Sequence, residues 1–169
     1  MFEGSELEEA FVAYQQRGLD AATTHDWNPW ADQFAEDATY VEHLYGSFEG
    51  REAIRAWITR TMTTFPGVRM PTFPVEWHVT DADRGWIVCQ IANRMQDPGD
   101  GSVHEASNLT VLHYAGDGLW SYEEDVYNPA HFMTMIQGWC RRAEELGNLP
   151  DDARAWLTLT ARRGGTAAS

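Results

Sequence analysis

Carboxylate and tyrosine side chains alternate in two segments that have the residue pattern of β-strands. Tyr40 and Glu42 are two residues apart in the first segment, and Asp125 and Tyr127 are two residues apart in the second. Because side chains alternate along a strand, the members of each pair point to one side. If two such carboxylates share a pocket, unlike surroundings give them unlike pKa values, which suits proton transfer in an isomerisation, cyclisation or dehydration. The alternative is that both acids are solvated strand residues of a chain that is acidic throughout.

The neighbouring strand segments supply further candidates for such a pocket. In the segment 85–96, Trp86 and Arg94 share one side with Val88 and Gln90. In the segment 103–114, His104 and Asn108 share one side. Arg94 is as well suited to a structural ion pair with Asp125 as to holding a ligand. We therefore expect the substrate-binding candidates to be Arg94, Asn108, His104, Tyr127 and Trp86.

Composition excludes several other chemistries. All twelve basic residues are arginine, so aldolases, pyridoxal enzymes and P-loop proteins that use a lysine are excluded. The net charge of −14 disfavours nucleic acid and anionic membranes as partners. The histidines form no metal-binding motif, and no GxSxG or GxGxxG turn is present, so we expect neither a metal nor a cofactor. The two cysteines, Cys89 and Cys140, are far apart and favour a reducing, cytoplasmic setting.

The order of expected elements favours an α+β fold with helices on one face of an antiparallel sheet. Gly18 is expected to end the first helix, and Gly46 and Gly50 are expected to bracket a turn. Trp27, Trp30, Trp57 and Trp139 lie on apolar helical stripes and are expected in the core. The expected helices are 5–17, a short one after Asp26, 51–64, 130–146 and one around 151–162. The expected strands are 39–43, 75–80, 85–96, 103–114 and 119–127.

Two segments resemble a known family. The segment DWNPWADQFAEDATYVEHLYGSFEGREAIRAWI (26–58) and the segment HYAGDGLWSYEEDVYNPAHF (113–132) resemble the SnoaL-like polyketide cyclases of the nuclear transport factor 2-like superfamily. Limonene-epoxide hydrolases and ketosteroid isomerases are cousins in that superfamily. The resemblance implies a cone-shaped, cystatin-like α+β barrel, in which a curved antiparallel sheet wraps around the N-terminal helices. Because this fold hosts several activities, the resemblance is specific for fold rather than for chemistry.

The same resemblance implies roles for single residues. Asp125 falls where the similar cyclases keep an acid/base aspartate, and Glu42 falls where the similar isomerases keep a general base. Tyr40 and Glu42 fall where the similar epoxide hydrolases hold the attacking water. Those hydrolases also pair an arginine with an aspartate two residues later. Here the residue two positions after Arg94 is Gln96, so the specific activity of those hydrolases is not expected. The oxyanion hole of the isomerases is not reproduced either.

These observations lead to one hypothesis and two alternatives. Residues 1–146 are expected to form a single domain and 147–169 an extension whose last residues, 162–169, are mobile. The expected function is cofactor-free acid/base chemistry on an apolar, ring-containing molecule, including isomerisation, cyclisation, dehydration or epoxide hydrolysis. Asp125, Glu42 and Tyr40 are the expected catalytic residues. The alternatives are a non-catalytic binder of a hydrophobic ligand and an assembly subunit with the same fold.

A homodimer is also expected, through the outer face of the sheet. The helices are expected to cover the concave face, which leaves the convex face exposed. Ile87, Cys89, Ile91, Val111 and Tyr122 are expected to make that face apolar.

Overall fold

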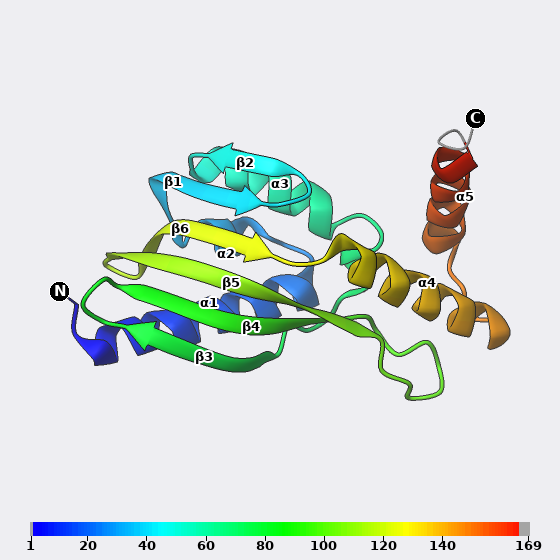
Figure 1. Ribbon diagram of the computed structural model, residues 1–169, viewed down its shortest axis with the longest axis horizontal. Coiled ribbons are helices and arrows are strands. Elements are labelled where there is room, and N and C mark those ends of the chain that lie inside the picture. The colour runs from blue at the N-terminus through cyan, green and yellow to red at the C-terminus, as the bar shows by residue number, and fades with distance from the viewer. Residues whose placement is uncertain (1, 166–169) are drawn as a thin grey trace.

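The computed structural model describes residues 2–165 of the chain (Figure 1). Its helices are α1 (Gly4–Thr24), α2 (Asn28–Ala31), α3 (Arg51–Met62), α4 (Pro129–Glu145) and α5 (Asp151–Gly165), with a 3₁₀ turn η1 (Gly67–Arg69). Its strands are β1 (Phe34–Glu42), β2 (Gly46–Glu49), β3 (Val75–Asp81), β4 (Trp86–Arg94), β5 (Glu105–Gly116) and β6 (Leu119–Val126). Residues 166–169, part of the segment expected to be mobile, lie outside this description.

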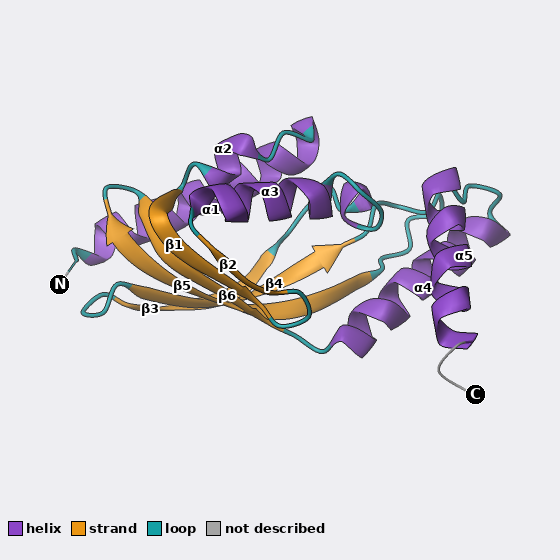
Figure 2. Cartoon of the chain, turned by 90° about the horizontal axis from the view of Figure 1, so that it is seen from above, coloured by secondary structure: helices purple, strands orange, loops and turns teal. Residues whose placement is uncertain are grey.

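The six strands form one curved sheet in the order β2-β1-β6-β5-β4-β3. Helices α1, α2 and α3 lie together on the concave face, while α4 and α5 extend from one end (Figure 2). The expected α+β fold, with N-terminal helices packed against a curved sheet, is confirmed. The sheet is open and does not close into a barrel, because β2 and β3 remain as its two edges.

One strand pair departs from the expected antiparallel arrangement. β1 runs parallel to β6, with Glu42 opposite Asp125, whereas the other four pairs are antiparallel. The chain leaves β1 through β2 and α3, crosses to β3 at the far edge, and returns strand by strand to β6. No hairpin joins β1 to β6, so no short turn forces these two strands to run in opposite directions.

Two local predictions were wrong. Gly18 does not end the first helix: α1 continues to Thr24, because Ala21 and Ala22 are buried on its inner face and Gly18 packs against Trp30. The segment between Gly46 and Gly50 is not only a turn, because it contains the short strand β2, which pairs with β1.

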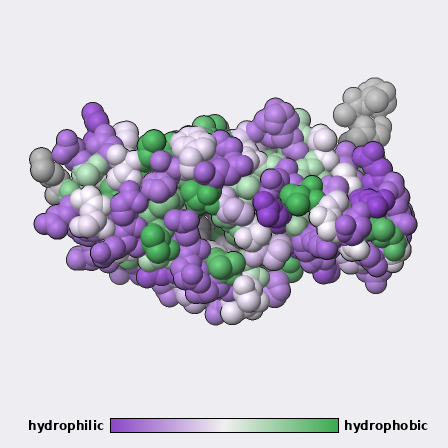
Figure 3. All heavy atoms as spheres, turned by 90° about the horizontal axis from the view of Figure 1, so that it is seen from below, coloured by the Kyte–Doolittle hydropathy of each residue, from purple (hydrophilic) through white to green (hydrophobic). Residues whose placement is uncertain are grey.

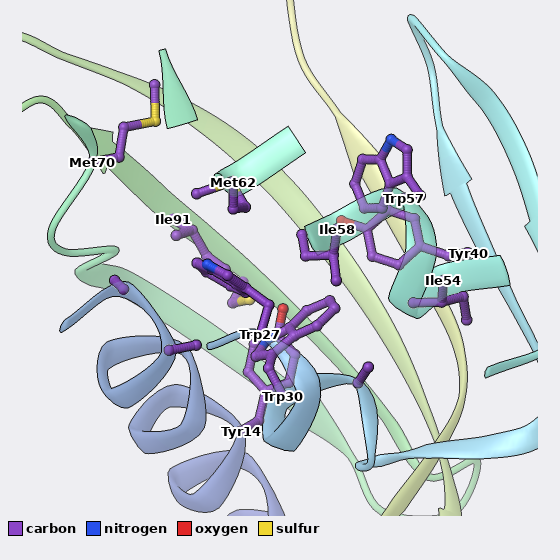
Figure 4. Packing of buried hydrophobic residues seen from close by; sticks show 14 of the residues in the cluster. Tyr14, Trp27, Trp30, Tyr40, Ile54, Trp57, Ile58, Met62, Met70 and Ile91 are labelled. Atoms are coloured by element: carbon purple, nitrogen blue, oxygen red, sulfur yellow. The ribbon is translucent and has the colours of Figure 1, made fainter. Parts of the chain in front are cut away.

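Aromatic side chains from the helices fill much of the space above the sheet (Figure 4). The four tryptophans expected in the core, Trp27, Trp30, Trp57 and Trp139, are all buried. Trp30 of α2 packs against Phe34 and Tyr40 with ring centroids 4.9 and 6.3 Å apart, which is ordinary geometry for aromatic pairs. These contacts hold the short helix α2 against β1, although four residues are too few to be stable as an isolated helix.

The side-chain alternation expected for β4 was also wrong. Ile87, Cys89 and Ile91 face the helices and are buried, whereas Trp86 is exposed on the convex face. The sequence WIVCQIANR has apolar residues at both parities, so alternation alone does not say which set faces the core. Besides Trp86, the convex face carries large apolar residues on the neighbouring strands. Those with more than a third of their surface exposed are Trp77, Val79, Leu109 and Val126.

Candidate active site

A cavity of about 520 Å³ lies between the helices and the concave face of the sheet. Its volume falls within the roughly 300–1,000 Å³ of small-molecule sites. The rings that line it come from helices α1, α2, α3, α4 and α5, from strand β1, and from the segments before α2, after β1, before β3 and after β6. They are Tyr14, Trp27, Trp30, Tyr40, Tyr45, Trp57, Phe73, Tyr127, Phe132 and Trp156. A few polar side chains lie among these apolar walls, as is usual for a site that orients an apolar ligand.

The cavity wall extends to the surface at the edge of the sheet. Gln15, Phe73 and Val75 line both this cavity and a smaller neighbouring hollow between α1 and the segment that precedes β3. Figure 3 views the molecule from the side of β3 and α1, and shows a hollow near the middle of this face with hydrophobic side chains beside it. At the other end, residues of α4 and α5, among them Phe132 and Trp156, contribute to the wall.

Asp125 lies in the cavity wall with hydrogen-bond donors around it. Its Oδ1 accepts hydrogen bonds from Asn108 Nδ2 at 2.7 Å and from Thr110 Oγ1 at 2.5 Å, and its Oδ2 accepts one from the Tyr40 hydroxyl. Thr110 is directly opposite Asp125 in the β5–β6 pair, and β1 brings Tyr40 from the other side. The strand register therefore builds this cluster from three adjacent strands.

The surroundings of Asp125 move its pKa toward neutrality. Burial raises the pKa most, the hydrogen bonds from Thr110, Tyr40 and Asn108 lower it, and the nearby Glu42 carboxylate raises it. The resulting pKa is about 6, compared with an ordinary value of 3.8. A carboxyl group with such a pKa can take up and return a proton near pH 7.

Glu42 also lies in the wall, but its oxygens are already engaged. Its Oε2 accepts hydrogen bonds from the backbone N–H groups of Leu44 at 2.8 Å and Tyr45 at 2.6 Å, and its Oε1 accepts one from the Tyr127 hydroxyl. The side chain is 4% exposed. Glu42 therefore fixes the turn between β1 and β2 and positions Tyr127.

A third carboxyl group, Glu123, was not among the predicted site residues. It lines the cavity two residues before Asp125, on the same side of β6, and is 2% exposed. Its Oε1 accepts a hydrogen bond from the Tyr14 hydroxyl at 2.8 Å, while its Oε2 has no hydrogen-bond partner. Burial and the negative charge of Asp125 raise its pKa well above the ordinary value. Its parity with Asp125 was the signal in the sequence that could have identified it.

Sequence comparison agrees with this architecture. The family model of the SnoaL-like domain matches residues 16–123, more than half of the chain. The chain belongs to the SnoaL-like family. Asp125 lies two residues beyond the matched segment, so its place in the site rests on the structure. No curated protein is significantly similar to this sequence.

Several solved structures resemble this SnoaL-like chain in fold. A limonene-epoxide-hydrolase-like epoxide hydrolase from Mycobacterium tuberculosis has a TM-score of 0.63 and 11% identity, over 89% of this chain and 98% of that one. A putative isomerase from Bacillus subtilis has a TM-score of 0.62 and 17% identity, over 82% and 97%. A protein with a ketosteroid isomerase-like fold from Catenulispora acidiphila, in complex with trimethylamine, has a TM-score of 0.59 and 20% identity, over 75% and 91%. At such identities the likeness establishes the fold alone.

The structure places the predicted site residues of this SnoaL-like chain in two groups. Asp125, Glu42, Tyr40, Asn108 and Tyr127 all line the cavity.

Arg94, Trp86 and His104 do not line the cavity. Arg94 pairs with Glu105 at 2.7 Å, because position 94 of β4 faces outward, and Asn93 takes the inward position instead. Trp86 stacks on His113 on the convex face for the same reason. His104 lies before β5 and its ring lies within hydrogen-bond distance of Ser102, at 3.3 Å.

No metal site is apparent in residues 2–165, where no group of three or more histidine, cysteine, aspartate or glutamate residues could hold an ion. No helix in the same range is long and apolar enough to cross a membrane.

The hydrogen bond from Tyr40 gives a prediction for the SnoaL-like site. Tyr40→Phe removes a donor that lowers the pKa of Asp125, so that pKa is expected to rise from about 6 by up to about one pH unit. Carboxyl ¹³C chemical shifts followed through a pH titration measure it directly. Tyr122→Phe is the matched control, because Tyr122 donates to Glu124 on the other face of β6. An unchanged pKa of Asp125 in Tyr40→Phe would contradict the assignment.

Proposed function

We propose that this SnoaL-like chain is an enzyme that moves a proton on an apolar, ring-containing molecule by acid/base chemistry that needs no cofactor. The observation that carries the proposal is the Asp125 carboxyl, which combines a pKa of about 6 with a position in the wall of an apolar cavity. General acid/base catalysis is most effective when the pKa of the group is near the working pH.

In the proposed reaction Asp125 takes a proton from the substrate and returns it at a second atom. Tyr40, Asn108 and Thr110 hold the carboxylate in one orientation through their hydrogen bonds. Glu42 acts as a positioning residue: its negative charge raises the pKa of Asp125, and its own oxygens hold the turn and Tyr127. Isomerisation, cyclisation and dehydration all need such a step, whereas in epoxide opening the proton is taken from the attacking water or hydroxyl and is given to the epoxide oxygen. The names isomerase and epoxide hydrolase among the structural neighbours are compatible with this class.

A generic proton-transfer substrate tests the proposal before the natural substrate is known. 5-Nitrobenzisoxazole is an apolar bicycle: when a base removes its ring C–H proton, the N–O bond breaks and a coloured nitrile phenolate forms. The chain is expected to accelerate this opening relative to acetate at equal concentration, with a rate that rises with pH around a midpoint near 6. Absence of acceleration, or a profile without this midpoint, would contradict the proposal.

A non-catalytic binder is the second candidate, favoured by the large share of apolar side chains in the cavity wall. A binder would retain ring-containing molecules in the cavity without accelerating the proton transfer. The same assay, combined with equilibrium dialysis of naphthalene, separates the two candidates. Binding without acceleration would support the binder.

We also propose a homodimer through the convex face of the sheet, with a second copy covering the exposed apolar residues there. Val79, Leu109 and Val126 are 59%, 38% and 40% exposed on adjacent or nearby strands of this face. Large exposed apolar residues on one face of a protein commonly mark interfaces. The double variant Val79→Glu/Leu109→Glu is expected to be monomeric in sedimentation experiments at micromolar concentration, where the unmodified chain is dimeric. A monomeric unmodified chain would contradict the proposal.

A further inference from the structure

The charges of the cavity wall are all of one sign. Three carboxyl groups, Glu42, Glu123 and Asp125, line it, and among the described residues that line it there is no arginine, lysine or histidine. The nearest titratable neighbours of Glu123 are equally without positive charge: Asp125, the hydroxyls of Tyr14 and Tyr40, and the Cys89 thiol. A cluster of acids without a counter-charge disfavours anionic ligands and favours cations.

One oxygen among these three carboxyl groups lacks a partner. Both oxygens of Glu42, both oxygens of Asp125 and Oε1 of Glu123 accept hydrogen bonds. Oε2 of Glu123 accepts none, although the side chain is 2% exposed. The Tyr40 hydroxyl is close enough to lower the pKa of Glu123, but it donates its proton to Asp125. A buried carboxyl oxygen without a partner is costly, and a ligand that donates to it removes that cost.

The aromatic rings of the wall add a second attraction for a cation. Tyr14 and Tyr40 donate to Glu123 and Asp125, and Trp30 packs against both tyrosine rings. Figure 4 shows Tyr14 next to Trp30, and Tyr40 next to Trp57. The faces of such rings carry negative potential and attract ammonium groups, most strongly where water is excluded.

We infer that the cavity takes an apolar, ring-containing molecule that carries a basic amine, with the ammonium N–H donating to Oε2 of Glu123 beside Asp125. This inference rests on the proposed function and narrows its substrate class. The apolar part of the ligand contacts the tryptophan side of the wall. When the ammonium group binds, Glu123 ionises and its carboxyl proton is released to solvent, so the ligand brings the counter-charge that the wall lacks.

Three probes of one shape test the inference. They are 2-(dimethylaminomethyl)naphthalene, which is protonated at pH 7, its neutral isostere 2-isobutylnaphthalene, and 2-naphthyl isopropyl ketone. Equilibrium dialysis measures the affinity of each for the unmodified chain, for Glu123→Gln, and for Glu124→Gln. Glu124 is the matched control, since it is the next residue on β6, faces the convex side, and pairs with His43 at 2.7 Å.

Glu123→Gln is expected to weaken binding of the amine at least about tenfold and to change binding of the hydrocarbon less than about twofold. Glu124→Gln is expected to change neither. Calorimetry of the amine at pH 7 in two buffers of different ionisation enthalpy is expected to show proton release from the unmodified chain. That release is expected to be lost in Glu123→Gln. Thermal unfolding of each variant checks that it is folded.

The outcomes separate this inference from the proposed function. If the hydrocarbon or the ketone binds but the amine does not, or if the amine binds equally well to Glu123→Gln, the amine assignment is overturned and the proposed function stands. If Glu123→Gln loses affinity for the ketone alone, the amine assignment is overturned. The ligand is then a carbonyl compound that accepts a hydrogen bond from protonated Glu123. If none of the three probes binds, the cavity is not a site for ring-containing molecules, and both proposals fail.

Discussion

Asp125→Asn is expected to lower the rate of 5-nitrobenzisoxazole opening by about 10²–10⁴, because the amide cannot accept the substrate proton. The change is nearly isosteric, and its effect on folding is expected to be small. Tyr40 and Thr110 surround the position with hydroxyl groups, which can rotate to accept from the new amide as well as donate to it. Initial rates above pH 7, where Asp125 in the unmodified chain is ionised, measure the effect.

Two controls separate catalysis from structure in this experiment. Binding of naphthalene by equilibrium dialysis is expected to change far less than the rate, since the apolar walls remain. Glu124→Gln, on the other face of the same strand, is expected to keep the full rate. Full activity of Asp125→Asn combined with a lower melting temperature would show that Asp125 is a structural residue and that the catalytic assignment is wrong.

The pH dependence of stability is expected to differ sharply between the unmodified chain and Glu123→Gln. The folded-state pKa of Glu123 lies well above its ordinary value of 4.5, so the folded protein keeps a proton that the unfolded chain releases. Its stabilising contribution is present below about pH 4.5 and is lost as the pH rises toward the folded-state pKa. The loss amounts to about 1.4 kcal/mol per pH unit in this window. Glu123→Gln lacks this loss, so its free energy of unfolding is expected to rise relative to that of the unmodified chain as the pH increases from 4.5 to 6.5.

Urea unfolding at pH 4.5, 5.5 and 6.5 measures this difference. Glu124→Gln provides a control of opposite sign, because hydrogen bonds from His43 and Tyr122 lower the pKa of Glu124. The contribution of Glu124 is present above pH 4.5 and is lost as the pH falls through its folded-state pKa, so Glu124→Gln is destabilised toward the higher pH. Parallel stability curves for the unmodified chain and Glu123→Gln would show that Glu123 ionises normally in the folded protein.

Local signals in the sequence predicted most of the fold. The short turns near Asp83, Gly99 and Asp117 each join antiparallel strands that the structure contains, and the helical apolar stripes place their tryptophans in the core. The start of α4 is equally local, because the Asn128 side chain accepts from the N–H of Ala130 and Pro129 occupies the first turn. Each of these features is determined by residues close together in the chain.

The features that the sequence did not predict depend on distant partners. The parallel pairing of Glu42 with Asp125 joins residues far apart in the chain, and no turn between them records it. The inward side of β4 was misassigned because both of its faces are apolar, which removed Arg94 and Trp86 from the site and admitted Asn93. Glu123 was visible as a residue of the same parity as Asp125. That its Oε2 has no hydrogen-bond partner, however, depends on where two distant hydroxyls donate. Tyr14 of α1 donates to Oε1 of Glu123, and Tyr40 of β1 donates to Asp125.

The cavity wall has two origins along the chain. Its acidic part belongs to the sheet, at Glu42, Glu123 and Asp125, whereas Phe132, Met133 and Trp156 come from the C-terminal helices α4 and α5. Substitutions in α4 and α5 can therefore change the size and shape of the molecule that is admitted without altering the hydrogen bonds around Asp125. Under the proposed function, redesign of the C-terminal helices is therefore expected to change which substrates the cavity admits, while the hydrogen bonds around Asp125 stay in place.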